Sequence, residues 1–277
     1  LFRSRKYNLF QQSFCKAMNG SDIEEKTADF VNAALLAKKA GFDAVEIHAG
    51  HGYLLSQFMS PFTNKRKDSY GGSIENRMRF PASIVQKVRT VLGPDFPILV
   101  KMNSRDGMKG GLEVEEAIIA AKIFETAGAS ALVPSAGFTS KTPFYMLRGN
   151  LPVNEMVKNQ KELFSKLGLL LFGRLLVQEY KFDKMFLLAS AKKIKEVVKI
   201  PVIYIGGAVS KKDMNRAIES GFEFIEVGRA TIRNPNFVND LEQGLIRESD
   251  CDHCNRCVAA MDGGGVYCVS KELGLMN

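Results

Sequence analysis

The sequence predicts an α/β protein with parallel strands, because short apolar runs alternate with amphipathic helical patterns along its 277 residues. Five strand-plus-helix units can be recognised, and several of the apolar runs end in polar residues or glycines. In a barrel or open sheet of parallel strands, ligands bind at the carboxyl ends of the strands. The length suits one α/β barrel or two smaller domains, and a closed barrel of this type has eight units.

Two amphipathic helices are predicted in the first third of the chain. Ser21 and Glu24 have the spacing of a capping box, so a helix is expected to begin there and to end near Gly41. A second helical pattern runs towards Gly93, with Pro81 inside it as a kink or a restart of the helix.

The strand between these helices carries the first candidate site. Residues 44–48 (Ala-Val-Glu-Ile-His) form a short, largely apolar run, so His48 is expected at the carboxyl end of a buried strand. His51 and Tyr53 follow on the turn, and a long polar loop spans residues 60–72. The place of these side chains at a strand end indicates a functional site.

The later units follow the same alternation. They comprise strands at 97–103, 131–133, 201–205 and 223–227 and helices at 113–127, 189–198 and 210–220. Residues 138–188 are too long for a simple connection, so they are expected to cross the active-site face with one or two helices, the run 167–177 forming a buried or loop-packing helix. Asn234 and Pro235 predict the start of a last helix that ends near Gly244.

The last two strands both run into glycines. Gly206 and Gly207 follow one strand, and Gly228 and Arg229 follow the next. Glycine lets a backbone N–H group approach an anion closely, and two such ends on adjacent strands favour a phosphate site over a ligand-free turn.

Composition narrows the classes of partner. The net charge of +8 and pI near 9.2 would suit an anionic ligand, but the Lys and Arg residues are spread over helix faces, so neither nucleic acid nor a membrane is expected. The longest apolar run is about half of the roughly 20 residues that a membrane helix needs. The amino-terminus lacks the features of a signal peptide, so we expect a cytoplasmic protein that acts on a small-molecule substrate. A homo-oligomer is compatible with the sequence.

Three stretches resemble a known family. IHAGHGYLLSQFMSPFTNKRKDSYGGSIENRMRF, VIYIGG and FIEVGRA look like the old yellow enzyme family of flavin-dependent ene-reductases, which includes the 2,4-dienoyl-CoA reductases. The resemblance implies a TIM (β/α)8-type barrel that binds FMN. It also implies that NAD(P)H delivers hydride to the flavin, which passes it to the β-carbon of an activated alkene, here an α,β-unsaturated carbonyl compound.

The resemblance also implies roles for single residues. His48 and His51 match the pair that hydrogen-bonds the substrate carbonyl oxygen, and Tyr53 matches the tyrosine that protonates the α-carbon. Lys101 stands where the family usually has Arg beside the flavin ring, so its charge is expected to be kept and its geometry altered. The FMN phosphate contacts match Gly206, Gly207, Gly228 and Arg229. A salt-bridged brace of the loop is expected from Arg66, Asp68, Tyr70, Glu75, Asn76 and Arg77.

Four cysteines near the end have a metal-ligand-like spacing: Cys251, Cys254, Cys257 and Cys268. They resemble the segment through which the dienoyl-CoA reductase branch binds a 4Fe-4S cluster, although two of the gaps are one residue shorter than in that branch. We therefore expect either bound metal, 4Fe-4S or Zn²⁺, or reduced thiols on a closing loop.

These observations predict three regions. Residues 1–20 form an amino-terminal segment that is poorly ordered or a remnant of an upstream region, 21–247 the last five units of an FMN-binding barrel, and 248–277 a cysteine-containing segment. The first three strands of the family have no counterpart in this chain, which predicts a fragment of a longer product or a decayed barrel. Two alternatives remain: a phosphate-binding barrel lyase or isomerase that uses His48 and His51 as acid and base, and an inactive, metal-held barrel fragment.

Overall fold

The structure is a computed structural model that describes residues 16–160, 162–261 and 264–272. Most of the predicted amino-terminal segment, residues 1–15, lies outside the described residues. The strands are β1 (Val45–Ala49), β2 (Ile98–Arg105), β3 (Ala131–Ala136), β4 (Ile203–Ile205) and β5 (Phe224–Glu226). The helices are α1 (Gly20–Lys39), α2 (Leu54–Met59), α3 (Ile74–Leu92), α4 (Val114–Thr126), α5 (Pro143–Met146), α6 (Val153–Asn159), α7 (Leu163–Leu176), α8 (Leu188–Lys195), α9 (Lys211–Glu219), α10 (Arg229–Arg233), α11 (Phe237–Glu242), α12 (Arg256–Ala260) and α13 (Val269–Glu272).

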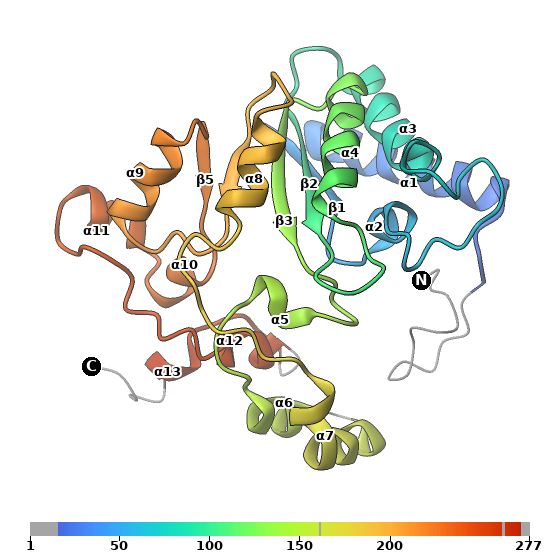
Figure 1. The fold of residues 1–277 in the computed structure, drawn as a ribbon. Coiled ribbons are helices and arrows are strands. Elements are labelled where there is room, and N and C mark those ends of the chain that lie inside the picture. The colour runs from blue at the N-terminus through green and yellow to red at the C-terminus, as the bar shows by residue number, and fades with distance from the viewer. Residues whose placement is uncertain (1–15, 161, 262–263, 273–277) are drawn as a thin grey trace.

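All five strands run parallel, in chain order. β1, β2 and β3 form one sheet, β4 and β5 pair with each other, and a parallel bridge from Leu132 to Val202 connects β3 with β4. Helices α1, α3, α4, α8 and α9 lie along the outside of the strands, and α5, α10 and α12 lie beyond one end of them (Figure 1). The strand-helix units and their order confirm the predicted TIM-barrel-type α/β fold.

The core lies between the strands and the outer helices. Every residue of β3 is buried, as expected for a strand of a parallel sheet with both faces covered. The inner face of α3 contributes Phe80, Ile84 and Val85, all fully buried. Pro81 lies inside this continuous helix, so the predicted restart is wrong. Packing of the buried face on both sides of Pro81 keeps the helix in one piece where the missing N–H would weaken it.

Both predicted helix starts at the two ends of the chain are shifted. At α1 the capping box is formed by Asn19 and Asp22, each side chain accepting the other's backbone N–H (2.9 and 2.8 Å), rather than by Ser21 and Glu24. Asn19 is extended and Ser21 is already helical, and a cap residue must lie outside the helix. The predicted last helix corresponds to α11, which α12 and α13 follow. It begins after Asn236 instead of Asn234, because the Asn234 side chain forms a turn by accepting the Asn236 N–H.

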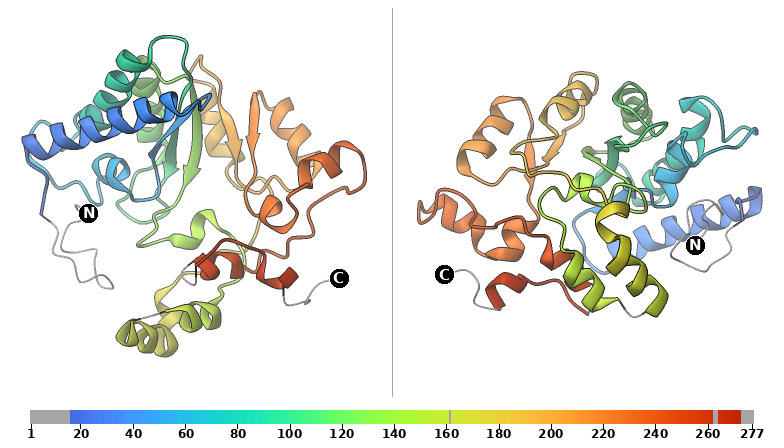
Figure 2. Two further views of the ribbon diagram at one scale, coloured as in Figure 1. Left: turned by 180° about the vertical axis from the view of Figure 1, so that it is seen from behind. Right: turned by 60° about the horizontal axis from the view of Figure 1, so that its bottom comes forward.

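The long excursion between β3 and α8 carries three helices, α5, α6 and α7, where one or two were predicted. α6 and α7 stand apart from the strands, at the bottom of the view (Figures 1 and 2). Residues 167–177 were predicted to form a buried or loop-packing helix, and burial is wrong, because α7 exposes apolar side chains of this range such as Leu170 (65%) and Leu171 (61%). Among the described residues, no helix is both long and apolar enough to cross a membrane.

The polar loop after β1 is braced in part as predicted, by Arg66, Asp68 and Tyr70, whereas the Asn76 side chain accepts from Arg79 of its own helix. Arg66 pairs with Asp68 (2.5 Å), and Asp68 also accepts the backbone N–H of Tyr70 (3.1 Å). Arg77 is buried and holds the loop from beneath by donating to the carbonyl of Gly72, but its ion-pair partner is Glu116 of α4 rather than a residue of the loop.

Candidate active site

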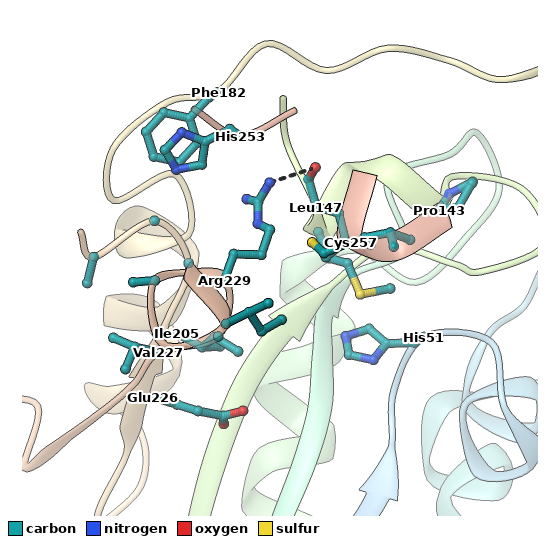
Figure 3. A pocket seen from close by; sticks show the side chains of 18 of the residues that line it. His51, Pro143, Leu147, Phe182, Ile205, Glu226, Val227, Arg229, His253 and Cys257 are labelled. Carbon is teal, nitrogen blue, oxygen red and sulfur yellow. Dashed lines mark hydrogen bonds between the residues drawn. The ribbon is translucent and has the colours of Figure 1, made fainter. Parts of the chain in front are cut away.

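A cavity of about 490 Å³ lies at the carboxyl ends of the strands (Figure 3). Its wall combines the turn after β1, the loops after β4 and β5, the excursion between β3 and α8, and the cysteine-containing segment. The lining includes His48, His51, Tyr53, Leu147, Phe182, Gly206, Gly207, Glu226, Gly228, Arg229, His253 and Cys257. The predicted substrate-binding and phosphate-binding residues therefore share one cavity.

The two histidines and the tyrosine come together on one side of this cavity. His48 Nε2 lies 3.1 Å from His51 Nδ1, and the ring centroids of His48 and Tyr53 are 5.1 Å apart in an edge arrangement. His51 is buried, whereas Tyr53 is 46% exposed. His51 takes a left-handed backbone conformation (φ +60°), which turns the chain sharply after β1 and carries Tyr53 to the cavity mouth.

Burial keeps both histidines neutral. It is the main cause that lowers the pKa of His48, with the Lys101 charge adding to the effect. Burial also lowers the pKa of His51 to about 3, assisted by His48 and Lys101. At neutral pH each imidazole therefore carries one N–H, which suits hydrogen bonding to an oxygen better than proton exchange.

Lys101 lies beneath the cavity between two carboxylates. Its Nζ is 2.8 Å from Glu46 of β1 and 2.7 Å from Glu226 of β5. Burial acts to lower the pKa of Lys101, but the bonds to both carboxylates outweigh it and the pKa is raised. The cation is thus kept but balanced by two anions, and of these three residues Glu226 lines the cavity. The predicted flavin contact of Lys101 stays a prediction.

The glycines after β4 and β5 serve different purposes. Gly207 has φ +80°, and a Cβ there would lie 2.8 Å from the backbone oxygen of Asp183, so the chain path itself requires glycine. A Cβ at Gly228 would meet nothing within 4 Å. Among the described residues, nothing accepts a hydrogen bond from the backbone N–H of Gly207 or Gly228, which leaves two donors for an anion. These loops fit the phosphate of a nucleotide cofactor.

Arg229 connects the cavity with the carboxyl-terminal segment. Its guanidinium donates to the backbone oxygens of Leu147 and Arg148 (3.4 and 2.8 Å) and to Asn255 Oδ1 (2.6 Å) (Figure 3). Burial lowers the pKa of Arg229, although a guanidinium remains charged in proteins. The three bonds hold the side chain towards the excursion, so its predicted phosphate contact stays a prediction.

The four cysteines surround a small cavity next to Arg229 and Arg233. Their thiols are free, and Cys254 Sγ lies 3.5 Å from Ser270 Oγ. In the described part of the chain, no group of three or more His, Cys, Asp or Glu side chains is arranged to hold a metal ion. Burial raises the pKa of the Cys251 and Cys257 thiols, which favours the protonated form. The described thiols are thus not gathered around one metal position, and the predicted 4Fe-4S cluster or Zn²⁺ stays a prediction.

Three residues of the site were missed from the sequence. Ser135 at the end of β3 has its Oγ 2.7 Å from His51 Nε2, and Asn103 of β2 accepts the backbone N–H of His51 at 3.0 Å. Glu226 balances Lys101. Each lies within the last three residues of a strand, which is the one signal that could have identified them.

Parallel strand-helix units with a ligand-sized cavity at the strands' carboxyl ends place this protein among the TIM-barrel-type α/β proteins. The chain belongs to the NADH:flavin oxidoreductase / NADH oxidase family, whose sequence model matches residues 4–139. This match confirms the family resemblance read from the sequence motifs.

Relatives extend the similarity beyond that region. The chain is 34% identical to 4,4'-dithiodibutanoate disulfide reductase of Rhodococcus erythropolis over 253 residues, 91% of this chain and 62% of that protein. It is 41% identical to cinnamate reductase of Clostridium sporogenes over 165 residues, 52% of this chain and 25% of that protein. The solved complex of 2-naphthoyl-CoA reductase with 2-naphthoyl-CoA aligns with a TM-score of 0.69 and 27% identity, covering 88% of this chain and 32% of that one.

Proposed function

We propose that the protein is an FMN-dependent oxidoreductase that passes hydride from NAD(P)H, through the flavin, to the activated C=C bond of an α,β-unsaturated carbonyl compound. The observation that carries this proposal is the shared cavity. His48, His51 and Tyr53 form one side of it, and Gly207 and Gly228 form the other. The family description, with NADH and flavin, and the name of the cinnamate reductase relative support the same reaction class.

The residues present fit FMN at its phosphate end. The free N–H groups of Gly207 and Gly228 would hold the phosphate, and the apolar wall from Ile205 would adjoin the rest of the cofactor. When bound, FMN would supply hydride transfer between nicotinamide and alkene, chemistry that no side chain provides.

The chain's own residues act on the substrate. Neutral His48 and His51 donate hydrogen bonds to the carbonyl oxygen, which stabilises the negative charge that develops there as the β-carbon is reduced. Tyr53, at the cavity mouth, gives its hydroxyl proton to the α-carbon and regains one from solvent, which its exposure permits.

A lyase or isomerase that uses His48 and His51 as acid and base has less support. Such a pair works best when its pKa values lie near the working pH, whereas burial lowers the pKa of His51 to about 3. The four cysteines are left without a role in this proposal, because they are not arranged around a metal ion.

Flavin spectroscopy of the purified protein tests the proposal. We expect added FMN to co-elute with the protein, its visible absorbance to bleach with NADH or NADPH without oxygen, and cyclohex-2-enone to restore it. Failure of the protein to retain FMN, or a bound flavin that neither nicotinamide reduces, would contradict the proposal. Bleaching without recovery by the enone would reject the alkene but keep the flavin chemistry.

A further inference from the structure

A row of hydrogen bonds connects the cavity with the barrel interior. Ser135 Oγ of β3 lies 2.7 Å from His51 Nε2, and His51 Nδ1 lies 3.1 Å from His48 Nε2. Ser135 is 2% exposed and does not line the cavity. The ring of His51 faces the cavity (Figure 3). His48 is therefore hydrogen-bonded to His51, and His51 to Ser135.

The position of each proton follows from the first bond in the row. The backbone N–H of Gly50 donates to His48 Nδ1 (3.3 Å), so a neutral His48 carries its proton on Nε2. That proton points to His51 Nδ1, which must accept it. His51 then carries its own proton on Nε2 and donates it to Ser135 Oγ.

Hydrogen bonds fix the backbone of His51. Asn103 Oδ1 accepts the N–H of His51 at 3.0 Å, and the N–H of Thr139 donates to the His51 carbonyl at 2.9 Å. Asn103 is itself fixed by donating to Asp106 and to the carbonyl of Gly137, both at 2.8 Å. A flip of the His51 ring would break its contacts with both His48 and Ser135, whereas a change of proton position keeps each ring nitrogen beside the same partner.

The row leaves one group unsatisfied. With Ser135 as acceptor, its own hydroxyl proton has no acceptor among the described residues. A carbonyl oxygen bound between the histidines would remove this defect. His48 Nε2–H and a new His51 Nδ1–H would both donate to the oxygen, and the Ser135 hydroxyl would donate to the bare His51 Nε2.

We propose that Ser135 is a positioning residue that sets the proton position on His51, accepting from Nε2–H in the free protein and donating to Nε2 when a carbonyl oxygen binds. The number of protons on His51 does not change: one leaves Nε2 for solvent and one arrives at Nδ1 from solvent. The ligand-bound half of this role rests on the proposed function, whereas the ligand-free half rests on the contacts alone.

Nitrogen-15 NMR of the full chain tests the ligand-free half, because the chain has three histidines and the ring signals can be assigned by substitution. We expect His48 and His51 as single Nε2–H tautomers, with a slowly exchanging N–H signal on His51. Ser135→Ala should lose that slow signal and mix the His51 tautomers. Ser135→Thr, which keeps the hydroxyl, should restore both. An Nδ1–H tautomer on His51 in the wild-type protein, or an unchanged spectrum in Ser135→Ala, would overturn the assignment.

Ser104→Ala is the matched control. Ser104 is as buried as Ser135 and donates to the Ser135 backbone oxygen (2.9 Å), but its hydroxyl touches neither imidazole. Its spectrum should therefore match the wild type. Loss of the slow His51 signal in Ser104→Ala as well would show a general loosening of the strand and would overturn a specific role for Ser135.

Cyclohex-2-enone, added to the FMN-loaded protein without a reductant, tests the ligand-bound half. We expect His51 to change to Nδ1–H, and Ser135→Ala to bind the enone roughly tenfold more weakly, because the bare His51 Nε2 is then a buried acceptor without a donor. Enone binding with His51 still in the Nε2–H form would overturn the reversal. If the enone does not bind at all, the proposed function and the reversal both fail, whereas the ligand-free assignment is judged separately.

Discussion

The two sides of the cavity are built from different materials. The β1–β3 side consists of polar side chains joined in a row, from His48 through His51 to Ser135. The β4–β5 side consists of backbone, with Gly207 held in a left-handed conformation against the carbonyl of Asp183. On the first side, a substitution can therefore remove a functional group and leave the backbone as it is. On the second side, a substitution at Gly207 changes the path of the backbone itself.

The largest effect is expected from a change on the side-chain side. Tyr53→Phe removes the proposed proton donor but keeps the ring beside His48, so turnover of the enone should fall about 100-fold or more. Reduction of the bound flavin by NAD(P)H should be unchanged and serves as the internal control. Equal losses in both half-reactions, measured by stopped-flow absorbance, would show that the tyrosine has a structural role instead.

His51, on the β1–β3 side, should make the free energy of unfolding depend on pH. The pKa of His51 is lowered from 6.5 to about 3 by burial, so the unfolded chain binds more protons below pH 6.5. Stability is therefore full above pH 6.5 and is lost as the pH falls towards 3, by about 2 kcal/mol at pH 5 from this group. Urea unfolding of the wild type and of His51→Asn at several pH values measures this loss of stability.

Asn is the suitable replacement because it tolerates the left-handed backbone at position 51 and does not titrate. His51→Asn should show a flatter decline of stability between pH 6.5 and 5 than the wild type. Parallel curves for the two proteins would show that the His51 imidazole is accessible to protons in the folded state.

Two glycine variants on the β4–β5 side test whether the backbone there requires glycine. Gly207→Ala forces a Cβ towards the backbone oxygen of Asp183 and should lower the free energy of unfolding by about 1–3 kcal/mol. Gly228→Ala meets open space and should leave stability unchanged. Chemical unfolding of both proteins gives the values. Equal stability of the two variants would contradict the view that the chain path after β4 requires glycine.

The smallest effect is expected outside both sides, in the loop brace. Asp68→Asn breaks the pair with Arg66, in which the carboxylate is 49% exposed. Solvent screens such pairs, so the free energy of unfolding should fall by less than about 1 kcal/mol. A larger loss in urea unfolding would show that the brace contributes to the barrel core. The buried Arg77, by contrast, holds Glu116 of a neighbouring helix.

The parts of the site that could be predicted are those encoded by local spacing. His48, His51 and Tyr53 are close in sequence, so a strand end and one turn are enough to bring them together. The same holds for Gly206 and Gly207 after β4. The helix starts were less predictable, because several polar residues near Asn19 and Asn234 compete for the cap and packing selects among them.

By itself the sequence determined the order of strands and helices, the polar ends of the strands and the family, since these depend on periodicity and on short motifs. Only the tertiary structure decided which distant groups meet. Ser135 reaches His51 across 84 positions and Lys101 reaches Glu226 across 125, because parallel strands set side by side bring their ends to one edge whatever their separation in the chain. Those long-range contacts set the proton positions and the charge balance of the cavity.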